Sequence, residues 1–311
     1  MSGDRRSIAT ALTAVENDTP QARDVLQDIH RLTGSALVVG FTGAPGVGKS
    51  TLLNACIRQF RHLSLTVGVV AVDPSSVFSG GAILGDRVRM QEHSGDNEVF
   101  IRSVANRGQL GGLFRSAVRV IDVLDAAGKD IVLIETVGTG QSEIEIAEIA
   151  QVKVVIIQPG AGDDIQAMKA GVLEIADILV VNKSDFPNAD HCVSDLRQMM
   201  RLRTESAGQI PIIKTNALNE EGVVELVDTI RRLESPDHYR HAGIERVRRL
   251  LVSEASKYWR RELLESEGAA VNAELDALSE QVLKADLTLD AAAEALSVRF
   301  SAVTRAHKRA K

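Results

Sequence analysis

The chain has 311 residues and a formal net charge of −6, from 36 lysines and arginines against 42 aspartates and glutamates. This acidic balance, without a long basic block before the C-terminal tail, argues against nucleic acid as a partner. No apolar run approaches the roughly 18 residues of a membrane span, so we expect no membrane contact and a cytoplasmic protein.

The first 33 residues have helical periodicity broken at Pro20, which predicts a helical extension over residues 1–33. Short apolar runs rich in β-branched residues then alternate with helical segments. Their apolar residues are consecutive, which is typical of strands covered on both faces in a parallel sheet. We therefore predict an α/β domain over residues 34–235, with strands at 36–42, 65–73, 98–103, 130–136, 153–158, 177–183 and 210–215.

The first predicted strand leads into GAPGVGKS, which matches the phosphate-loop spacing G-x-x-x-x-G-K-[ST] and precedes a helical segment. Glycines let such a loop turn its backbone N–H groups toward phosphates, and the following helix adds its positive end. Lys49 supplies a catalytic positive charge to the β- and γ-phosphates, and the Ser50 hydroxyl is placed to bind Mg²⁺. A turn that binds nothing is the alternative, but it leaves the lysine unexplained. The predicted phosphate-binding residues are Gly43, Ala44, Pro45, Gly46, Val47, Gly48, Lys49, Ser50 and Thr51.

The second predicted strand ends in a carboxylate, Asp73, followed by PSS. Because this strand end lies close to the phosphate loop in a parallel sheet, Asp73 is a second candidate for the Mg²⁺ site, with a turn or helix cap as the alternative. In GGAILGDRVRM, which follows, Asp86 either approaches Mg²⁺ in one nucleotide state or is a solvated loop acid.

The segment LGGLFRSAVRVIDVLDAAG predicts a helix that ends at Gly128. Its apolar residues fall on one stripe, as expected of a helix that covers a sheet. The members of the stripe are Leu110, Leu113, Phe114, Ala117, Val118, Ile121 and Leu124.

The fourth predicted strand ends in Glu135, within DIVLIETVGTGQSE. A carboxylate at the tip of an apolar strand is costly unless a cation or another partner lies beside it, so we assign Glu135 to Mg²⁺ or its water shell. Gly138 is expected to direct its backbone N–H to the γ-phosphate, as in the D-x-x-G switch of G proteins. Because Thr139 and not glutamine follows that glycine, Gln141 is only a weak candidate for positioning water, and we expect slow intrinsic hydrolysis.

The motif that selects the base is NKSD, residues 182–185, after the sixth predicted strand. It fits the N-K-x-D pattern by which G proteins bind guanine, since the Asp185 carboxylate can accept hydrogen bonds from guanine N1 and N2, a donor pair that adenine lacks. Asn182 and Lys183 are expected to brace the loop and cover the ring. An ordinary polar turn is the alternative.

A second base-binding loop is predicted at TNAL, residues 215–218, after the seventh strand. G proteins normally carry a Ser-Ala-type sequence at this point, and here Asn216 replaces the serine. The expected contact to guanine O6 comes from a backbone N–H near Ala217, with Leu218 next to it.

After Pro236 the pattern becomes helical only, which predicts two or three helices in a C-terminal extension over residues 236–311. Cys56 and Cys192 are isolated in the sequence, so we expect two reduced thiols and no disulfide.

Several motifs in this order resemble the MeaB/ArgK family of GTPases, the chaperones of adenosylcobalamin-dependent methylmalonyl-CoA mutase. They are GAPGVGKS, VDPSS with GGAILGDRVRM, ETVGTGQSE, PGAGDDIQAMKAG and NKSD. The resemblance runs from about residue 4 into the C-terminal helices. It implies an α/β GTPase domain with helical extensions at both ends and a homodimer formed through the C-terminal arm.

The resemblance also implies binding of GTP, GDP and Mg²⁺ and slow GTP hydrolysis stimulated by an acyl-CoA mutase, with methylmalonyl-CoA mutase first among the candidates. The implied task is to gate cofactor loading and to protect or reactivate the mutase, with its adenosyltransferase as a further candidate partner. Residues 159–169 are implied to be a third switch loop that brings Lys169 near the active complex.

Other classes of protein share the phosphate loop. Metal-delivery GTPases normally carry Cys-x-Cys motifs or His tracts, whereas this chain offers isolated cysteines and the near pair His238 and His241. A P-loop kinase needs an acceptor and a base within hydrogen-bond reach of it, and no motif for either stands out. A nucleotide-binding module without turnover is a further alternative.

Overall fold

The structure is a computed structural model, and it describes residues 4–17, 19–73, 91–93, 95–105, 112–136, 149–160, 173–201, 210–233, 248, 251–252, 255–256, 269–284, 286–288, 290–292 and 295–296. The chain divides into two compact units, residues 1–248 and 249–311. The three-part division at residues 33/34 and 235/236 stays a prediction.

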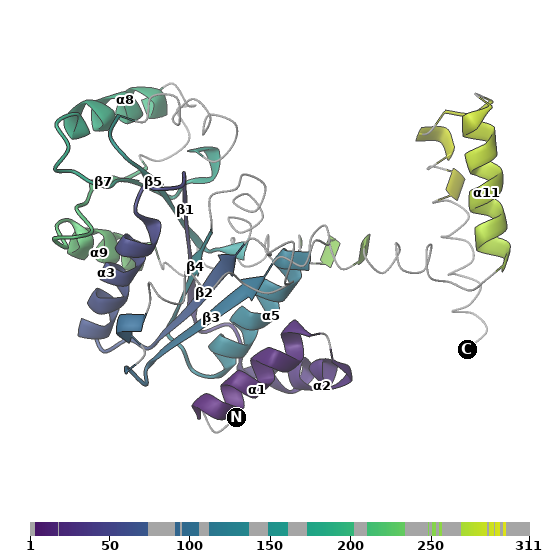
Figure 1. Cartoon of the computed structure of the whole chain (residues 1–311), viewed down its shortest axis with the longest axis horizontal. Helices are drawn as coiled ribbons and strands as arrows, with labels where there is room; N and C mark the ends of the chain where they lie inside the picture. Colours follow the sequence, from purple (N-terminus) through teal and green to yellow (C-terminus); the bar gives the residue numbers. More distant parts are fainter. Residues whose placement is uncertain are drawn as a thin grey trace. The chain divides into compact units, whose positions relative to one another are not determined.

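The first unit is built on a seven-stranded sheet in which all the described pairings are parallel (Figure 1). The strands are β1 Leu37–Gly43, β2 Val67–Asp73, β3 Val99–Ala105, β4 Ile131–Glu135, β5 Val152–Ile157, β6 Ile178–Val181 and β7 Ile212–Lys214. Their order in the sheet is β3-β2-β4-β1-β5-β6-β7. All seven predicted strands and the parallel α/β class are therefore confirmed. The prediction was possible because consecutive apolar residues indicate strands that are buried on both faces.

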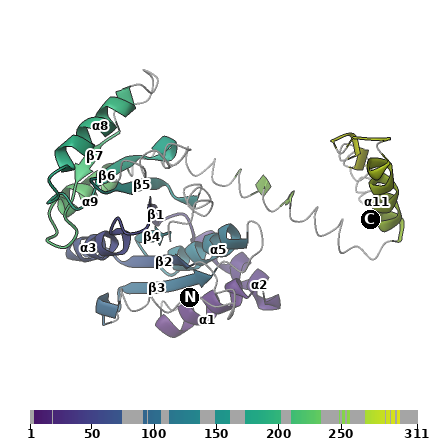
Figure 2. The same cartoon turned by 45° about the horizontal axis from the view of Figure 1, so that its top comes forward.

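Helices cover both faces of this sheet, as Figure 2 shows. The helices α3 (Lys49–His62) and α9 (Val223–Arg232) share one core cluster with Val154 and Ile156 of β5. The intervening Val155 and Ile157 belong to a second cluster with α8 (Ala189–Arg201). Alternate side chains of one strand thus enter the two opposite helix layers.

The helix α5 (Gly112–Ala126) lies on the face opposite α3, where Gly68 of β2 lets it approach closely. A Cβ atom at Gly68 would lie 3.0 Å from the Leu124 side chain. As predicted, the helix ends just before Gly128, whose φ of 82° requires the left-handed region.

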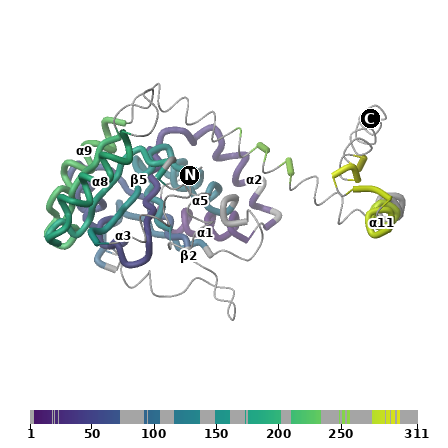
Figure 3. The backbone as a smooth tube through the Cα atoms, turned by 90° about the horizontal axis from the view of Figure 1, so that it is seen from above, coloured from purple at the N-terminus to yellow at the C-terminus, as the bar shows by residue number. Residues whose placement is uncertain are grey.

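The apolar stripe predicted for α5 was too narrow. Its members Ala117, Val118, Ile121 and Leu124 are buried, whereas Leu110 and the side chains of Leu113 and Phe114 lie outside the described residues. Val120 and Val123 are fully buried as well, and α1 (Arg5–Glu16) and α2 (Pro20–Ile29) pack on α5 (Figure 3).

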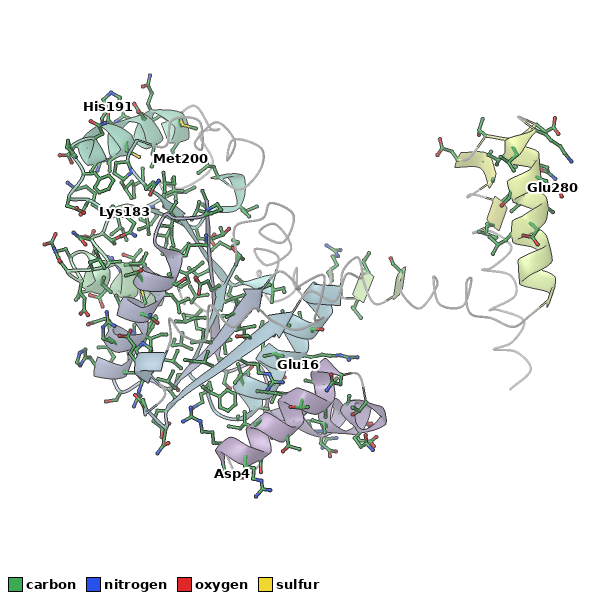
Figure 4. All side chains as sticks on the ribbon, viewed as in Figure 1. Asp4, Glu16, Lys183, His191, Met200 and Glu280 are labelled. Atoms are coloured by element: carbon green, nitrogen blue, oxygen red, sulfur yellow. The ribbon has the colours of Figure 1, made fainter. Side chains whose placement is uncertain are left out.

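The N-terminal helices are defined by local signals, and an ion pair joins α1 to the sheet. Asp4 caps α1 by accepting hydrogen bonds from the N–H groups of Arg6 and Ser7, and Pro20 occupies the first turn of α2. Glu16, at the end of α1, accepts a hydrogen bond of 2.6 Å from Nε of Arg102 on β3 (Figure 4).

The entry to β1 is fixed by a carboxylate from α5. After α2 and the short helix η1 (His30–Leu32), the N–H groups of Gly34, Ser35 and Ala36 donate to Asp125 at 2.6, 3.2 and 3.0 Å. These bonds fix the point at which β1 begins. They therefore also help to fix the position of its carboxyl end, from which the phosphate loop follows. Two further short helices, η2 (Gln91–His93) and η3 (Leu173–Ile175), precede β3 and β6.

The second unit contains α11 (Ala269–Leu283), whose described side chains are largely exposed. Lys284 pairs with Glu280 at 3.1 Å, one turn apart (Figure 4). Within the described part of the chain, no helix is long and apolar enough to cross a membrane.

Candidate nucleotide-binding site

The loop between β1 and α3 depends on its glycines for two different reasons. Gly46 and Gly48 have φ values of 82° and 93°, which ordinary residues rarely adopt. A Cβ atom at Gly43 would lie 2.3 Å from the Ile156 carbonyl oxygen, and one at Gly48 would lie 2.5 Å from Asn182 Nδ2. The sequence predicted a loop that turns around phosphates, and close packing against β5 and the NKSD loop is the additional reason for glycine.

Lys49, the first residue of α3, is buried with only 7% of its surface exposed. Its Nζ donates hydrogen bonds to the carbonyl oxygens of Gly43 and Ala44 at 2.8 and 3.0 Å. These bonds hold the ammonium inside the loop, where the low local dielectric strengthens its attraction for an anion.

Ser50 and Glu135 meet beside the phosphate loop. The Ser50 hydroxyl donates to Glu135 Oε1 at 2.5 Å, and Glu135 is 6% exposed at the end of β4. In the sheet, Glu135 lies level with Phe41 of β1 and Ala71 of β2, so the register places this carboxylate next to the phosphate loop.

The oxygens of Ser50 and Glu135 fit a magnesium ion. Mg²⁺ prefers hard oxygen ligands and is usually bound by one or two protein groups together with phosphates and water. A hydroxyl and a carboxylate whose oxygens already converge can provide this partial set. Asp73 ends β2 as predicted, but its side chain lies outside the described residues.

The remaining predicted switch and metal residues are Asp86, Gly138, Gln141 and Lys169, all outside the described residues. Their assigned roles stay predictions.

Asn182, which immediately follows β6, connects three loops. Its Nδ2 donates to the Val47 carbonyl oxygen at 2.8 Å. Its Oδ1 accepts from the Thr215 hydroxyl at 3.0 Å and from the Ala217 N–H at 3.2 Å. With 2% of its surface exposed, Asn182 joins the phosphate loop to both base-binding loops. The N–H that we predicted for guanine O6 is therefore already engaged with Asn182, and a base oxygen would share it.

Lys183, labelled in Figure 4, is held against the phosphate loop. Its Nζ donates to the Gly46 carbonyl oxygen and to Gln158 Oε1, both at 2.7 Å. The ammonium also lies 5.9 Å from the centre of the Phe186 ring. Lys183 has a φ of 57°, a conformation that costs a non-glycine residue free energy and that the surrounding contacts must maintain.

The NK pair orients the phosphate loop. Asn182 and Lys183 bind the consecutive carbonyls of Val47 and Gly46. Because the C=O and N–H groups of a trans peptide point in opposite directions, holding these carbonyls on the NKSD side turns the following N–H groups away from it. Of these two N–H groups, that of Val47 donates to the Ala44 carbonyl oxygen at 3.5 Å, so the predicted base-binding motif helps to present the Gly48 N–H.

Asp185 carries an exposed carboxylate whose Oδ1 accepts a hydrogen bond of 3.0 Å from Asn216 Nδ2. The Asn216 side chain also accepts from the N–H groups of Leu218 and Asn219 at 3.1 and 3.4 Å. Its backbone forms a reciprocal pair with Glu221 at 3.0 and 3.1 Å. Asn216 therefore orients the Asp185 carboxylate, a contact that sequence reasoning missed because it concentrated on the neighbouring N–H.

A pocket of about 780 Å³ runs from the phosphate loop along α3. It includes Lys49, Ser50 and Glu135 at one end and reaches Ala217 and the 84% exposed Leu218 of the TNAL loop. Its described lining residues are Pro45, Gly46, Gly48, Lys49, Ser50, Thr51, Asn54, Arg58, Val72, Glu92, Glu135, Thr136, Ala217 and Leu218. This volume is within the range of small-molecule and cofactor sites.

One wall of the pocket is formed by Arg58, which pairs with Glu92 and Glu220, each at 2.6 Å. Next to Glu92, burial lowers the pKa of His93; Glu92 and Asp96 oppose this shift, while Arg58 adds to it. The imidazole is therefore kept neutral more strongly than an exposed histidine.

The two cysteines lie outside this pocket's lining. Burial raises the pKa of Cys56 to about 12 and also raises the pKa of Cys192. Both side chains are therefore protonated thiols at neutral pH. In the described residues, no three side chains of the His, Cys, Asp and Glu types gather as a metal site would require.

Comparison with known proteins agrees with this geometry. The family model for the methylmalonyl-CoA mutase-associated GTPase MeaB matches residues 8–273. A protein of Pyrococcus abyssi, named as a GTPase, is 48% identical over 233 residues, which cover 74% of this chain and 72% of the relative. The GTPase ArgK of Escherichia coli is 38% identical over 234 residues, covering 72% and 70%. The solved structure of an LAO/AO transport system kinase superposes with a TM-score of 0.70 at 25% identity, covering 96% of this chain and 94% of that one.

Proposed function

The chain belongs to the MeaB family of GTPases, and from this membership we propose that it is a GTP-dependent chaperone of an adenosylcobalamin-dependent acyl-CoA mutase, with methylmalonyl-CoA mutase first among the candidates. In this role it gates cofactor loading and protects or reactivates the mutase. The observation that carries the proposal is the hydrogen-bonded network through which Asn182, Lys183 and Asn216 join a guanine-selective carboxylate to a phosphate loop.

Binding of the nucleotide follows from the two ends of the site. Asp185, oriented by Asn216, accepts hydrogen bonds from guanine N1 and N2 and thereby rejects adenine. The Lys183 side chain covers one face of the ring while its ammonium stays on Gly46. On binding, Lys49 exchanges its loop carbonyls for phosphate oxygens, and the positive end of α3 adds to the attraction.

Hydrolysis of GTP depends on stabilising the charge that develops on the transferring phosphate. Lys49 provides a fixed positive charge, and Ser50 and Glu135 would hold Mg²⁺, which neutralises phosphate charge when bound. The predicted contributions of Gly138 and Gln141 complete the site. Because Gln141 does not follow the glycine directly, we expect slow intrinsic hydrolysis that the mutase accelerates.

Communication with the mutase follows from reciprocal coupling. A partner that binds the GTP form and the GDP form with different affinity changes their populations, and the nucleotide changes the partner's state by the same free energy. We assign this communication to residues 159–169, including Lys169, and dimer formation to residues 236–311. The adenosyltransferase that supplies the mutase is a further candidate partner.

Two alternatives use the same phosphate loop. The first alternative is a kinase, which is what the name of the LAO/AO transport system kinase suggests. A metal-delivery GTPase would need a metal-binding group, whereas the thiols of Cys56 and Cys192 are held protonated by burial.

The decisive experiment measures nucleotide preference and the fate of the γ-phosphate. We expect calorimetry with Mg²⁺ to show GTP bound at least about 100-fold more tightly than ATP, since a bound adenine would cover the Asp185 carboxylate without offering it the donors of guanine N1 and N2. Labelled γ-phosphate should appear as inorganic phosphate. Equal affinity for ATP would exclude the guanine site, and label on protein or a small molecule would favour the kinase.

The mutase assignment needs a separate measurement. Co-purification with candidate acyl-CoA mutases, in GDP and in a non-hydrolysable GTP analogue, should give nucleotide-dependent capture of one mutase together with faster GTP hydrolysis. Capture that is independent of nucleotide, without stimulated hydrolysis, would contradict a nucleotide-gated chaperone.

A further inference from the structure

Gln158 is a partly buried residue directly after β5 that none of the nucleotide-binding motifs explains. Its Oε1 accepts a hydrogen bond of 2.7 Å from Nζ of Lys183. A hydrogen bond to an ammonium group is charge-assisted and stronger than one between neutral groups. This contact therefore links the end of β5 to the base-binding loop.

The sheet order explains why a residue of β5 can reach Lys183. β5 lies between β1, which delivers the phosphate loop, and β6, which delivers NKSD. Strand β5 pairs with β1 up to Gly43 and Ile156, and with β6 up to Ile157 and Val181. A side chain at the carboxyl end of β5 consequently lies between the two loops that together bind base and phosphates.

Among the described hydrogen bonds of the Lys183 ammonium, the bond to Gln158 is the one whose acceptor is a side chain and can be removed by mutation. The other acceptor is the Gly46 carbonyl, which is main chain, and the Phe186 ring lies 5.9 Å away. A lysine side chain has four rotatable bonds, so one acceptor leaves it several conformations. Two acceptors at 2.7 Å, one in the phosphate loop and one directly after β5, fix the direction of the stem between them.

We propose that Gln158 is a positioning residue for guanine nucleotides, which acts by holding the Lys183 ammonium against the Gly46 carbonyl. It keeps the lysine stem where it covers the base, and it stabilises the phosphate-loop peptide that Lys183 binds. The proposal rests on the proposed function, in which Lys183 covers guanine. An acceptor is required at position 158, so glutamate can replace glutamine and leucine cannot.

A double-mutant cycle tests this role. Gln158→Leu and Gln158→Glu are made in the full-length chain, each with Lys183 intact and with Lys183→Ala, and Kd for GDP and GTP is measured together with KM and kcat. Loss of the charge-assisted bond should raise Kd and KM for both nucleotides about five- to tenfold in Gln158→Leu and change kcat less than about twofold. Gln158→Glu should stay within about twofold of wild type.

The Lys183→Ala background separates positioning from a purely structural role. There, Gln158→Leu should change Kd by less than about twofold, because the group that Gln158 holds is gone. An equal effect in both backgrounds, or an unchanged Kd with Lys183 intact, would overturn the proposal. Should Gln158→Leu not fold, Gln158→Met removes the same acceptor and is judged by the same values.

The same titrations include ATP with the wild-type chain. Tight ATP binding would defeat the guanine assignment itself, whatever the cycle reports about Gln158. Strong GTP selectivity with no coupling between positions 158 and 183 would defeat only the positioning role.

Discussion

At the phosphate end of the proposed nucleotide site, Lys49 and Glu135 are buried and carry the charges themselves, with 7% and 6% of their surfaces exposed. At the predicted base end, the carboxylate of Asp185 is exposed, and its orientation comes from Asn216. The buried residue at that end, Asn182, is neutral, and its side-chain amide forms three hydrogen bonds to neighbouring loops. The phosphate end thus depends on single charges at low dielectric, whereas the base end depends on a network. Substitutions should therefore abolish activity at the first end and change selectivity at the second.

The largest effect is expected at the phosphate end. Lys49→Ala removes the charge that stabilises the transferring phosphate and should lower kcat/KM for GTP by about 10³-fold or more. Because Lys49 does not distinguish bases, hydrolysis of GTP and of ITP should fall together. The measurement is phosphate release with both nucleotides, with thermal unfolding as the control for folding. A selective loss of GTP hydrolysis would break the proposed separation between the two ends.

The next effect is a change of base selection. Asp185→Asn replaces an acceptor by a group that can also donate, which mismatches guanine N2 and suits the O2 carbonyl of xanthine. We expect GTP affinity to fall about 100-fold and XTP affinity to rise, while kcat with saturating XTP stays near that of wild type with GTP. Calorimetry and phosphate release with the two nucleotides check this. Unchanged GTP affinity would mean that another group reads the base.

A smaller effect tests the network behind the carboxylate. Asn216→Ala frees the carboxylate of Asp185 to rotate, so its contacts to guanine N1 and N2 should both weaken. Inosine lacks the 2-amino group, and the GTP-to-ITP affinity ratio should therefore fall about fivefold. Asn216→Ser, which keeps a donor, is the matched control. Equal weakening of GTP and ITP would show that Asn216 only supports the loop.

The smallest effect concerns His93, which is next in sequence to Glu92 of the pocket wall. Because burial lowers the pKa of His93, the unfolded chain takes up a proton more readily than the folded chain. Its contribution to stability is therefore complete above about pH 6.5, the ordinary value for histidine, and falls as the pH drops below it. Denaturant unfolding between pH 7 and pH 5 should show a shallower loss of stability in His93→Gln than in wild type. An identical pH slope would contradict the shift.

The strands and the phosphate loop could be read from the sequence because they depend on local information. Continuous apolar runs marked all seven strands, and the glycine and lysine spacing marked residues 43–50. The helix α5 was read less completely. Val120 borders the predicted stripe, three residues after Ala117, whereas Val123 lies outside it on the side of the helix toward Arg119, whose guanidinium donates to Val15 of α1. A one-sided pattern cannot indicate a third layer.

The site divides in the same way. NKSD indicated Asp185 as the group that selects guanine, and the sequence also suggested that Asn182 and Lys183 brace the loop. What they brace could not be inferred, because Val47, Thr215 and Gln158 are distant in the sequence and share no motif with them. Nor did the motif reveal the hydrogen bond that Asn216 donates to Asp185.

The amino-acid sequence by itself determined the parallel α/β class, the family and the chemical groups available for a guanine nucleotide, since these follow from local periodicity and from motifs in which the residue types carry the chemistry. The tertiary structure decided which of those groups are held in place by hydrogen bonds, and which residues form these bonds. The order β1-β5-β6 brings three strand ends together. Only this juxtaposition lets the Gln158 side chain and the Gly46 carbonyl both accept hydrogen bonds from the Lys183 ammonium group. Hydrogen bonds of this kind depend on distances across a sheet, which separation along the chain does not specify.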